Sequence, residues 1–320
     1  MRLIGHDEAW AVWRAAQAGQ RMHHGWILAG REGLGKASFA RAAAAELVAE
    51  PGVPQPAPEM HPDIHVLEPL PSNDDEARKR DDGKAYTRKR NISVDQIRGV
   101  QRRLVTRPTL GTRRAVIIDA ADDLEKGAVN ALLKSLEEPP VGTFFLLVTH
   151  QIGRLLPTVR SRCTVLRFQP LEPDDMARAL TQAAPELGGA ALEAAISAGS
   201  GAPGAALAFA EMELGAAWKI MTRLATEGDP DLALRGELSA ALGQRPDRER
   251  LLAAIEAARR VLVAALARCD DAARLRIVEA HAALATLAAQ APTYNFEPAL
   301  LLLEIGGLLA SVARTRENAA

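Results

Sequence analysis

The residues with the clearest chemical potential form a glycine loop from Gly30 to Ala37, of sequence GREGLGKA. The loop follows the short apolar segment from Trp26 to Ala29 and opens an alanine-rich segment, which is the strand, loop and helix context of a phosphate-binding P-loop. Glycines let backbone N–H groups surround phosphate oxygens, and a lysine at the helix start would reach the β- and γ-phosphates. The candidate nucleotide-binding residues are Gly30, Gly33, Gly35 and Lys36; the alternative is a glycine loop that only turns the chain.

This loop lacks one part of a magnesium site, because Ala37 stands where the motif needs the hydroxyl group of a serine or threonine. Ser38 comes one residue late, and on a helix it would point about 100° away. Two alternatives are therefore open at this point: binding of ATP or ADP without efficient hydrolysis, and no nucleotide binding at all.

A second candidate is Asp119, which ends the apolar segment from Ala115 to Ile118 and is expected to hold a magnesium-bound water. An ATPase of this kind needs a glutamate at the next position to orient and deprotonate the attacking water, and Ala120 can do neither. Asp122 or Glu125 could in principle replace it, although neither occupies the strand end. The sequence therefore predicts a degenerate nucleotide site and no intrinsic ATPase activity.

The elements that must position these residues alternate between strand-like and helix-like segments, which is the pattern of a parallel sheet covered by helices. Ser93 and Gln96 have the spacing of a capping box at a helix start. The segment from Leu67 to Asn91 is polar and charged and is predicted to be a mobile insertion, whose basic cluster either contacts DNA or is a solvated loop. Strands are expected at residues 26–29, 64–67, 115–118 and 144–148.

The character of the chain changes after Phe168, where Pro170 and Pro173 precede alanine- and leucine-rich segments with helical periodicity. This change predicts an α/β module with the degenerate nucleotide site over residues 1–169. A compact helical lid is expected over 170–210, and a separate all-α bundle over 211–320.

Composition narrows the function classes. The chain has 320 residues, 48% apolar content and a net charge of −1, so contact with nucleic acid would need a local patch or a partner. No apolar run is long enough to cross a bilayer and no signal-peptide core is seen, which predicts a cytoplasmic protein without membrane contact. Cys163 and Cys269 lie far apart without CxxC spacing, which argues against disulfides and a cysteine zinc site and favours two buried thiols.

Several longer segments resemble one protein family. Residues 130–140, of sequence NALLKSLEEPP, resemble the helix after the Walker B strand in bacterial clamp-loader AAA+ subunits, and residues 158–163, TVRSRC, resemble their SRC motif. Further features are similar to the delta-prime branch of this family, a component of the DNA polymerase III holoenzyme: His24, the step from His61 to Asp63, and residues 94–98, 201–207, 295 and 301–304.

The resemblance implies a RecA-like AAA+ module, a helical lid and a collar that assembles a pentameric ring with delta and gamma or tau subunits. Such a ring helps to load the sliding clamp onto primer–template DNA. Thr149 stands where the family has its first sensor residue. Arg162 would enter the nucleotide site of the adjacent subunit as a trans arginine finger, whereas an isolated arginine would more often form a surface ion pair. Arg160 is more ambiguous and would support the loop.

Two departures from the family pattern matter. Many members carry a four-cysteine zinc module after the first helix, but residues 51–59 contain no cysteine, so neither zinc nor any other metal ligand set is expected. Ala205 stands at the lid position that usually carries a sensor arginine in the ATPase subunits.

Two competing hypotheses remain for the function. One is an active ATP-hydrolysing motor resembling the gamma subunit, which Ala37 and Ala120 disfavour. The other is a DNA-binding or nuclease module, which the 4% aromatic content disfavours.

Overall fold

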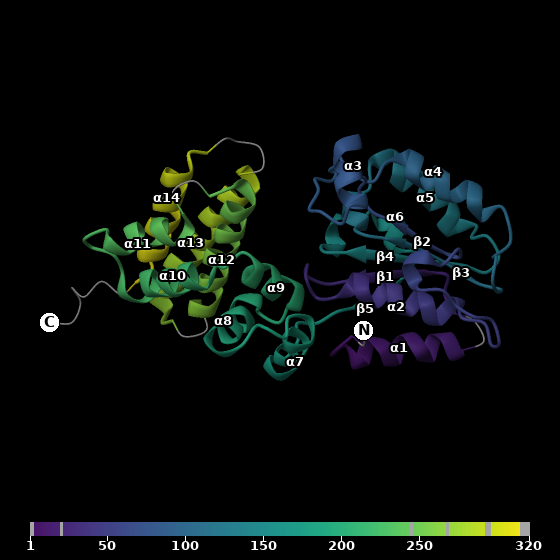
Figure 1. Ribbon diagram of the computed structural model, residues 1–320, viewed down its shortest axis with the longest axis horizontal. Coiled ribbons are helices and arrows are strands. Elements are labelled where there is room, and N and C mark those ends of the chain that lie inside the picture. The colour runs from purple at the N-terminus through teal and green to yellow at the C-terminus, as the bar shows by residue number, and fades with distance from the viewer. Residues whose placement is uncertain (1–2, 20–21, 244–245, 267–268, 292–295, 314–320) are drawn as a thin grey trace. The chain divides into compact units, whose positions relative to one another are not determined.

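The computed structural model of the chain describes residues 3–19, 22–243, 246–266, 269–291 and 296–313. The chain divides into two compact units, Met1–Leu171 and Glu172–Ala320 (Figure 1). Each unit has its own set of buried apolar residues. The first unit contains the strands and the second is helical. The further division of the second unit into a lid and a collar stays a prediction.

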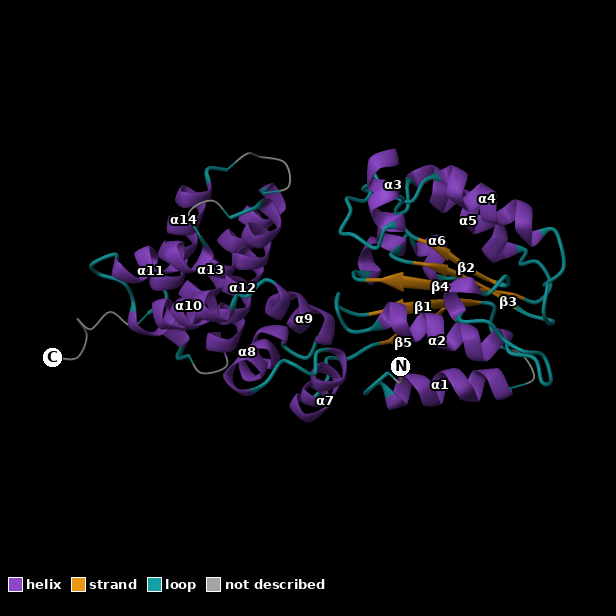
Figure 2. Cartoon of the chain, viewed as in Figure 1, coloured by secondary structure: helices purple, strands orange, loops and turns teal. Residues whose placement is uncertain are grey.

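In the described part of the first unit, five parallel strands form one sheet in the order β2-β3-β4-β1-β5 (Figure 2). β1 and β3 are buried along their whole length, as expected of apolar strands covered on both faces. Four strands lie where the apolar segments predict them. The fifth, β5, has no continuous apolar run to predict it, because only Leu166 of its residues is buried. The bounds are β1 (Gly25–Ala29), β2 (Ile64–Leu67), β3 (Arg114–Ile118), β4 (Thr143–Thr149) and β5 (Thr164–Arg167).

Helices cover both faces of this sheet (Figure 1). α1 (Asp7–Ala18) and α2 (Lys36–Val48) pack on one face, while α4 (Val94–Leu104) and α5 (Lys126–Glu137) pack on the other. The short α6 (Pro157–Arg160) precedes β5. The predicted capping box is confirmed, since Ser93 Oγ accepts a hydrogen bond from Gln96 N at 3.4 Å and Gln96 Oε1 accepts one from Ser93 N at 3.1 Å.

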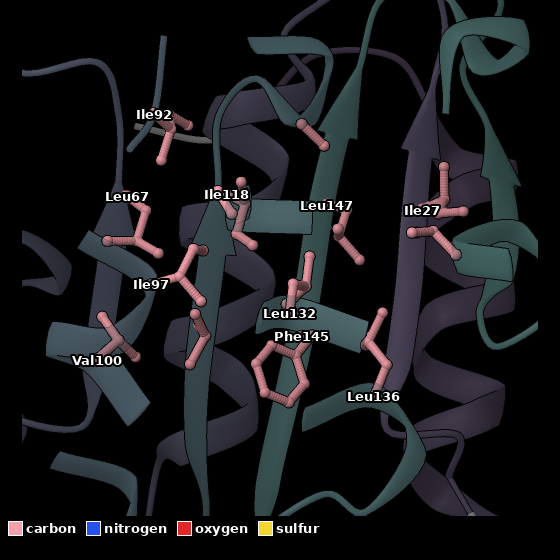
Figure 3. Packing of buried hydrophobic residues seen from close by; sticks show 14 of the residues in the cluster. Ile27, Leu67, Ile92, Ile97, Val100, Ile118, Leu132, Leu136, Phe145 and Leu147 are labelled. Atoms are coloured by element: carbon pink, nitrogen blue, oxygen red, sulfur yellow. The ribbon is translucent and has the colours of Figure 1, made fainter. Parts of the chain in front are cut away.

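Two apolar clusters hold the layers together. On the second face, side chains of α4 and α5 interdigitate with those of the sheet (Figure 3), among them Ile27, Leu67, Ile97, Val100, Leu132, Leu136, Phe145 and Leu147. On the first face the cluster is aromatic: the ring of Trp13 lies 5.2 Å from that of Trp26 and 6.3 Å from that of Phe39, between ring centroids. The sheet is therefore a rigid support for loops at both of its edges.

The charged insertion contains a helix, α3 (Asp74–Asp81). The Asn73 side chain caps it by accepting a hydrogen bond from Glu76 N at 2.9 Å, and i,i+3 ion pairs such as Lys79 with Glu76 add local support. No residue of α3 is buried. The expectation that this segment cannot order itself is therefore wrong for residues 74–81, because capping and charge pairing supply what apolar burial does not; its mobility stays a prediction.

The described residues of the second unit form helices joined by loops, with no strand among them. α8 and α9 pack together, and α14 packs against α10, α11, α12 and α13. Arg260 of α12 donates a 2.7 Å hydrogen bond to the carbonyl oxygen of Ala198 in α8. The helices are α7 (Pro173–Ala183), α8 (Gly189–Gly199), α9 (Pro203–Glu211), α10 (Gly215–Glu227), α11 (Ala233–Leu242), α12 (Arg248–Leu266), α13 (Asp271–Gln290) and α14 (Pro298–Ala310). Among the described residues of both units, no helix combines the length and apolar character needed to cross a bilayer.

Candidate functional site

The glycine loop connects the carboxyl end of β1 to the first residue of α2. Gly33 and Gly35 adopt φ angles of 79° and 81°, a region that glycine enters without steric cost. A Cβ atom at Gly30 would lie 2.7 Å from the carbonyl oxygen of Phe168, so only glycine lets the loop pass this close to the end of β5. The loop thus has the backbone form of a phosphate-binding loop, and that form explains its three glycines.

N-terminal residues pack on this loop, which the sequence does not predict. His6 Nε2 donates a 2.7 Å hydrogen bond to the carbonyl oxygen of Leu34. The His6 ring also meets the ring of Phe168 at a centroid distance of 4.9 Å. A Cβ atom at Gly35 would lie 3.2 Å from a methyl group of Leu3. The loop is therefore held between the N-terminal segment and the end of β5.

Lys36 is almost fully buried, with 3% of its surface exposed. Its Nζ donates a 2.5 Å hydrogen bond to the carbonyl oxygen of Arg31 in the same loop. Burial lowers the pKa of the Lys36 ammonium from its ordinary 10.5 to about 8, against the opposing effect of nearby carboxylates, first of all Asp119. A buried ammonium whose hydrogen bond in the described structure goes to one neutral carbonyl is well suited to receive an anion.

The start of α2 does not complete a magnesium site. Ala37 carries no oxygen, and Ser38 is exposed on the surface of the helix. The loop and Lys36 fit a phosphate group, but a hydroxyl ligand for a phosphate-bound metal ion is missing. This agrees with the geometry expected from the sequence, in which residues 37 and 38 point in different directions.

Asp119 directly follows β3, and its backbone N–H donates to the carbonyl oxygen of Leu67 at 2.9 Å. Burial raises the pKa of the Asp119 carboxyl, the negative charge of Glu68 raises it further, and nearby cations, among them Lys36, oppose the rise. The charges of Asp119 and Lys36 each affect the pKa of the other group, so both lie at the carboxyl edge of the sheet. The neighbouring Ala120 is buried and offers only a methyl group where a general base would be needed.

The side chain of Asp122 binds the end of β4. Its carboxylate accepts hydrogen bonds from Thr149 Oγ1 at 2.8 Å, from His150 N at 2.7 Å and from Gln151 N at 3.3 Å. Thr149, the predicted sensor, is fully buried, so its hydroxyl is fixed on this carboxylate. With three hydrogen bonds from within the fold, this carboxylate serves as a structural tie for the end of β4. Glu125, the other substitute considered, is an exposed residue that precedes α5.

Glu68 is a charged residue of this edge that no sequence motif identified. It directly follows β2, forms an ion pair with Arg41 of α2, and forms a second with Arg88 at 2.9 Å. Its carbonyl oxygen also accepts a 2.8 Å hydrogen bond from Gln96 Nε2. The signal was present, because an acidic residue directly after a predicted parallel strand lies at the same edge as Asp119.

Arg162 lies between α6 and β5, and three oxygen atoms surround its guanidinium group. Nη1 donates to the carbonyl oxygen of Thr158 at 3.0 Å and to Ser161 Oγ at 3.4 Å. Nη2 forms an ion pair with Glu137 Oε1, the last residue of α5, at 2.8 Å. Both ionic side chains keep substantial exposure, 36% for Arg162 and 48% for Glu137. Arg162 therefore forms the surface ion pair that is typical of an isolated arginine.

The position of Arg162 excludes contact with its own glycine loop. Arg162 adjoins the start of β1, since a Cβ atom at Gly25 would lie 3.0 Å from the Arg162 carbonyl oxygen. The glycine loop begins after the other end of β1, and five residues of a strand at about 3.3 Å each separate the two by roughly 15 Å. That distance exceeds the length of an arginine side chain. A phosphate held by the glycine loop of the same chain is therefore out of reach of Arg162.

Three residues near Arg162 lie at the amino edge of the sheet without a hydrogen bond or ion pair to its guanidinium group: His24, Arg160 and Cys163. His24 Nε2 donates a 2.9 Å hydrogen bond to the carbonyl oxygen of Leu136, which ties the start of β1 to the end of α5. Burial raises the pKa of the Cys163 thiol to about 12, so the cysteine of the SRC segment is a packing residue. Arg160 is exposed, and its guanidinium has no hydrogen bond or ion pair among the described residues.

Comparison with known proteins agrees with this arrangement. Residues 5–172 match the model of the family described as DNA polymerase III, delta subunit. The DNA polymerase III subunit delta' of Pseudomonas aeruginosa is 36% identical over 164 residues, which are 48% of this chain and 45% of that protein. The subunit delta' of Escherichia coli is 42% identical over 123 residues, which are 38% of this chain and 36% of that protein. The matched segments thus span less than half of each relative.

The fold has a solved counterpart. A crystal structure of a DNA polymerase III gamma subunit-related protein from Thermotoga maritima superposes with a TM-score of 0.51 at 18% identity, covering 95% of this chain and 99% of that one. At this identity the likeness concerns the fold alone, and it confirms the expected AAA+ arrangement of a parallel sheet followed by helices. The family model covers more than half of the chain, including the glycine loop, Asp119 and the SRC segment, and the chain therefore belongs to the DNA polymerase III, delta subunit family.

Proposed function

We propose that the chain is a clamp-loader subunit that does not hydrolyse ATP itself and supplies Arg162 to the nucleotide site of a neighbouring subunit. The observation that carries the proposal is the contrast between two edges of one sheet. At the carboxyl edge the glycine loop and Lys36 are intact, but Ala37 and Ala120 replace the metal ligand and the base. At the amino edge an arginine is held in place, out of reach of its own loop.

The chemistry of the first edge supports retention of a phosphate group without turnover. Lys36 and the loop N–H groups can bind an anion, and Asp119 lies beside them. Phosphoryl transfer depends on positioned charge and on a group that orients the attacking water. Asp122 accepts three hydrogen bonds from within the fold and Glu125 is exposed, so neither of the two carboxylates that could replace the missing base is well placed to take that role.

The chemistry of the second edge supports a role in trans. A guanidinium group presents a planar fork of N–H donors that matches phosphate oxygens, and it stays charged at any physiological pH. Arg162 is partly exposed, so a partner surface can reach it. In other phosphoryl-transfer systems an arginine supplied across an interface is worth about 10³ to 10⁵ in rate.

The partners follow from the same proposal. The curated relatives are subunits of DNA polymerase III named delta', gamma and gamma/tau. The chain would join gamma or tau and delta subunits in a pentameric ring, and would act with that ring on the sliding clamp and primer–template DNA in the cytoplasm. In this proposal residues 170–210 form the lid and residues 211–320 form the collar through which the ring assembles.

The test is to rebuild the ring with the full-length chain and to measure ATP hydrolysis stimulated by DNA and clamp. Arg162→Ala should lower turnover sharply but partially, because only the site at this interface depends on it. Arg162→Lys should not restore full activity, since an ammonium cannot reproduce the planar fork. Arg160→Ala is the matched control, because its guanidinium group is a neighbouring charge with no hydrogen bond or ion pair among the described residues, and the variant should leave turnover near the wild-type value.

Two outcomes would contradict the proposal. Wild-type turnover in an assembled Arg162→Ala ring would reject the trans-acting role, whereas loss of assembly would make Arg162 a structural interface residue. In the same series the isolated full-length chain should hydrolyse ATP negligibly. Turnover of the isolated chain at the rate of an ordinary AAA+ motor, abolished by Lys36→Ala, would reject the non-hydrolysing part.

A further inference from the structure

The contacts of Arg162 come from two separate elements that converge on one guanidinium group. Glu137 is the last residue of α5, and Thr158 belongs to α6. Nη2 pairs with Glu137 while Nη1 donates to Thr158 O and Ser161 Oγ, and no acceptor among the described residues takes the Nε–H. The side chain is thus fixed from one side, and part of its donor fork stays free.

The platform that carries Glu137 is rigid. Leu136 is 1% exposed and packs in the core between α5 and the sheet. Its carbonyl oxygen is also bound by His24 at 2.9 Å, which ties this turn of α5 to the start of β1. Glu137 therefore presents its carboxylate from a fixed backbone position.

Neither helix stability nor folding accounts for a carboxylate at this position. An acidic residue in the last turn of a helix lies against the negative end of the helix dipole. An ion pair as exposed as that of Glu137 and Arg162 contributes little to the free energy of unfolding. The consequence of the pair is instead that one rotamer of a long, flexible side chain is selected.

We propose that Glu137 is a positioning residue for Arg162, which holds the guanidinium group in the orientation that it needs to meet a phosphate on a neighbouring subunit. This role rests on the proposed function and adds a residue to it. Immobilising one rotamer-rich side chain costs about 0.5 to 1.5 kcal/mol, and prior fixation removes that cost from the catalysed step. If this free energy were added to the activation barrier, the rate of the catalysed step would fall by a factor of about 2 to 10.

The experiment uses rings rebuilt with full-length Glu137→Gln, Glu138→Gln, Arg162→Ala and the Glu137→Gln/Arg162→Ala double variant. Glu138 is the matched control, because it is the adjacent residue with the same charge and has no ion pair among the described residues. Glu137→Gln should lower the Arg162-dependent part of kcat about 2- to 10-fold and leave the KM for ATP nearly unchanged. Glu138→Gln should behave as wild type, and Glu137→Gln should cause no further loss when Arg162 is already alanine.

The two proposals fail in different ways. If Arg162→Ala lowers turnover but Glu137→Gln matches Glu138→Gln, the positioning role is wrong and the trans role stands. If Glu137→Gln causes the same loss with and without Arg162, it acts by another route and the positioning role is wrong. Wild-type turnover in the Arg162→Ala ring would reject both. Should the Glu137→Gln ring fail to assemble, Glu137→Asp keeps the charge but withdraws the carboxylate, and the same comparisons apply.

Discussion

The two edges of the sheet differ in what their residues can still do. At the carboxyl edge the backbone of a phosphate-binding loop survives, with Lys36 buried beneath it and Asp119 at the end of β3, but two side chains needed for hydrolysis are alanines. At the amino edge the Arg162 guanidinium group meets three oxygen atoms, which belong to Glu137 of α5, Thr158 of α6 and Ser161 directly after α6. In the proposed function, the first edge has the backbone of a nucleotide site without two of its catalytic side chains, and the second edge supplies an arginine to a partner.

This difference suggests that the carboxyl edge is retained as a scaffold. Asp122 ties the ends of β3 and β4 together, and Glu68 ties the end of β2 to α2 through Arg41. Both carboxylates are occupied by neighbours within the fold. A residue that has become structural in this way should affect stability when it is removed, whereas a residue kept for catalysis in trans should affect only the assembled complex.

The largest stability effect is expected from Asp122→Ala. The substitution removes the acceptor of three hydrogen bonds and leaves the hydroxyl group of the buried Thr149 without its partner, so the free energy of unfolding should fall by about 2 to 4 kcal/mol. Chemical denaturation measures it. Asp123→Ala is the matched control. Burial raises the pKa of the Asp123 carboxyl, which means that the fold disfavours its ionised form, so removing this carboxyl should lower the free energy of unfolding much less. Equal losses in the two variants would contradict the scaffold role of Asp122.

A somewhat smaller effect concerns pH. The pKa of Lys36 is lowered from 10.5 to about 8 by burial, so between these values the unfolded chain holds a proton that the folded chain has lost. The free energy of unfolding should therefore rise with pH across this window, by about 2 to 3 kcal/mol, and this rise should be absent in Lys36→Met.

The measurement is chemical denaturation of the wild type and of Lys36→Met at pH 8 and at pH 10.5. The quantity compared is the change in the free energy of unfolding between the two pH values. Cys163 has the opposite effect, because burial raises the pKa of its thiol to about 12, so the folded chain keeps a proton that the unfolded chain loses. That contribution is the same in both proteins and cancels in the difference. Parallel pH dependence of the wild type and Lys36→Met would show that the Lys36 ammonium is not buried as described.

Much of the first unit could be predicted from the sequence, because β1, β3 and β4 contain continuous apolar runs and the turns carry strong signals. The glycine loop, the strand before Asp119 and the capping box at Ser93 are local patterns whose geometry follows from backbone sterics. β5 escaped prediction because its burial depends on pairing with β1 and not on its own composition. α3 escaped because charge pairs, and not apolar periodicity, support it.

The side-chain contacts of the candidate residues could not be predicted from the sequence. Glu137 and Arg162 lie in two separate motif segments, and nothing in their spacing indicates that α5 and α6 bring them together. Thr149 was predicted as a sensor, but its contact with Asp122 requires the register of β3 against β4. Long-range pairs of this kind depend on the sheet order, which local patterns do not specify.

The central claim is that this subunit contributes Arg162 to catalysis and performs no hydrolysis at its own loop. The most direct test compares two rings, one containing Lys36→Met and the other Arg162→Ala, each confirmed by size to be fully assembled. ATP turnover stimulated by DNA and clamp should stay near the wild-type value with Lys36→Met and fall sharply with Arg162→Ala. The reverse pattern, a loss with Lys36→Met and wild-type turnover with Arg162→Ala, would contradict the account.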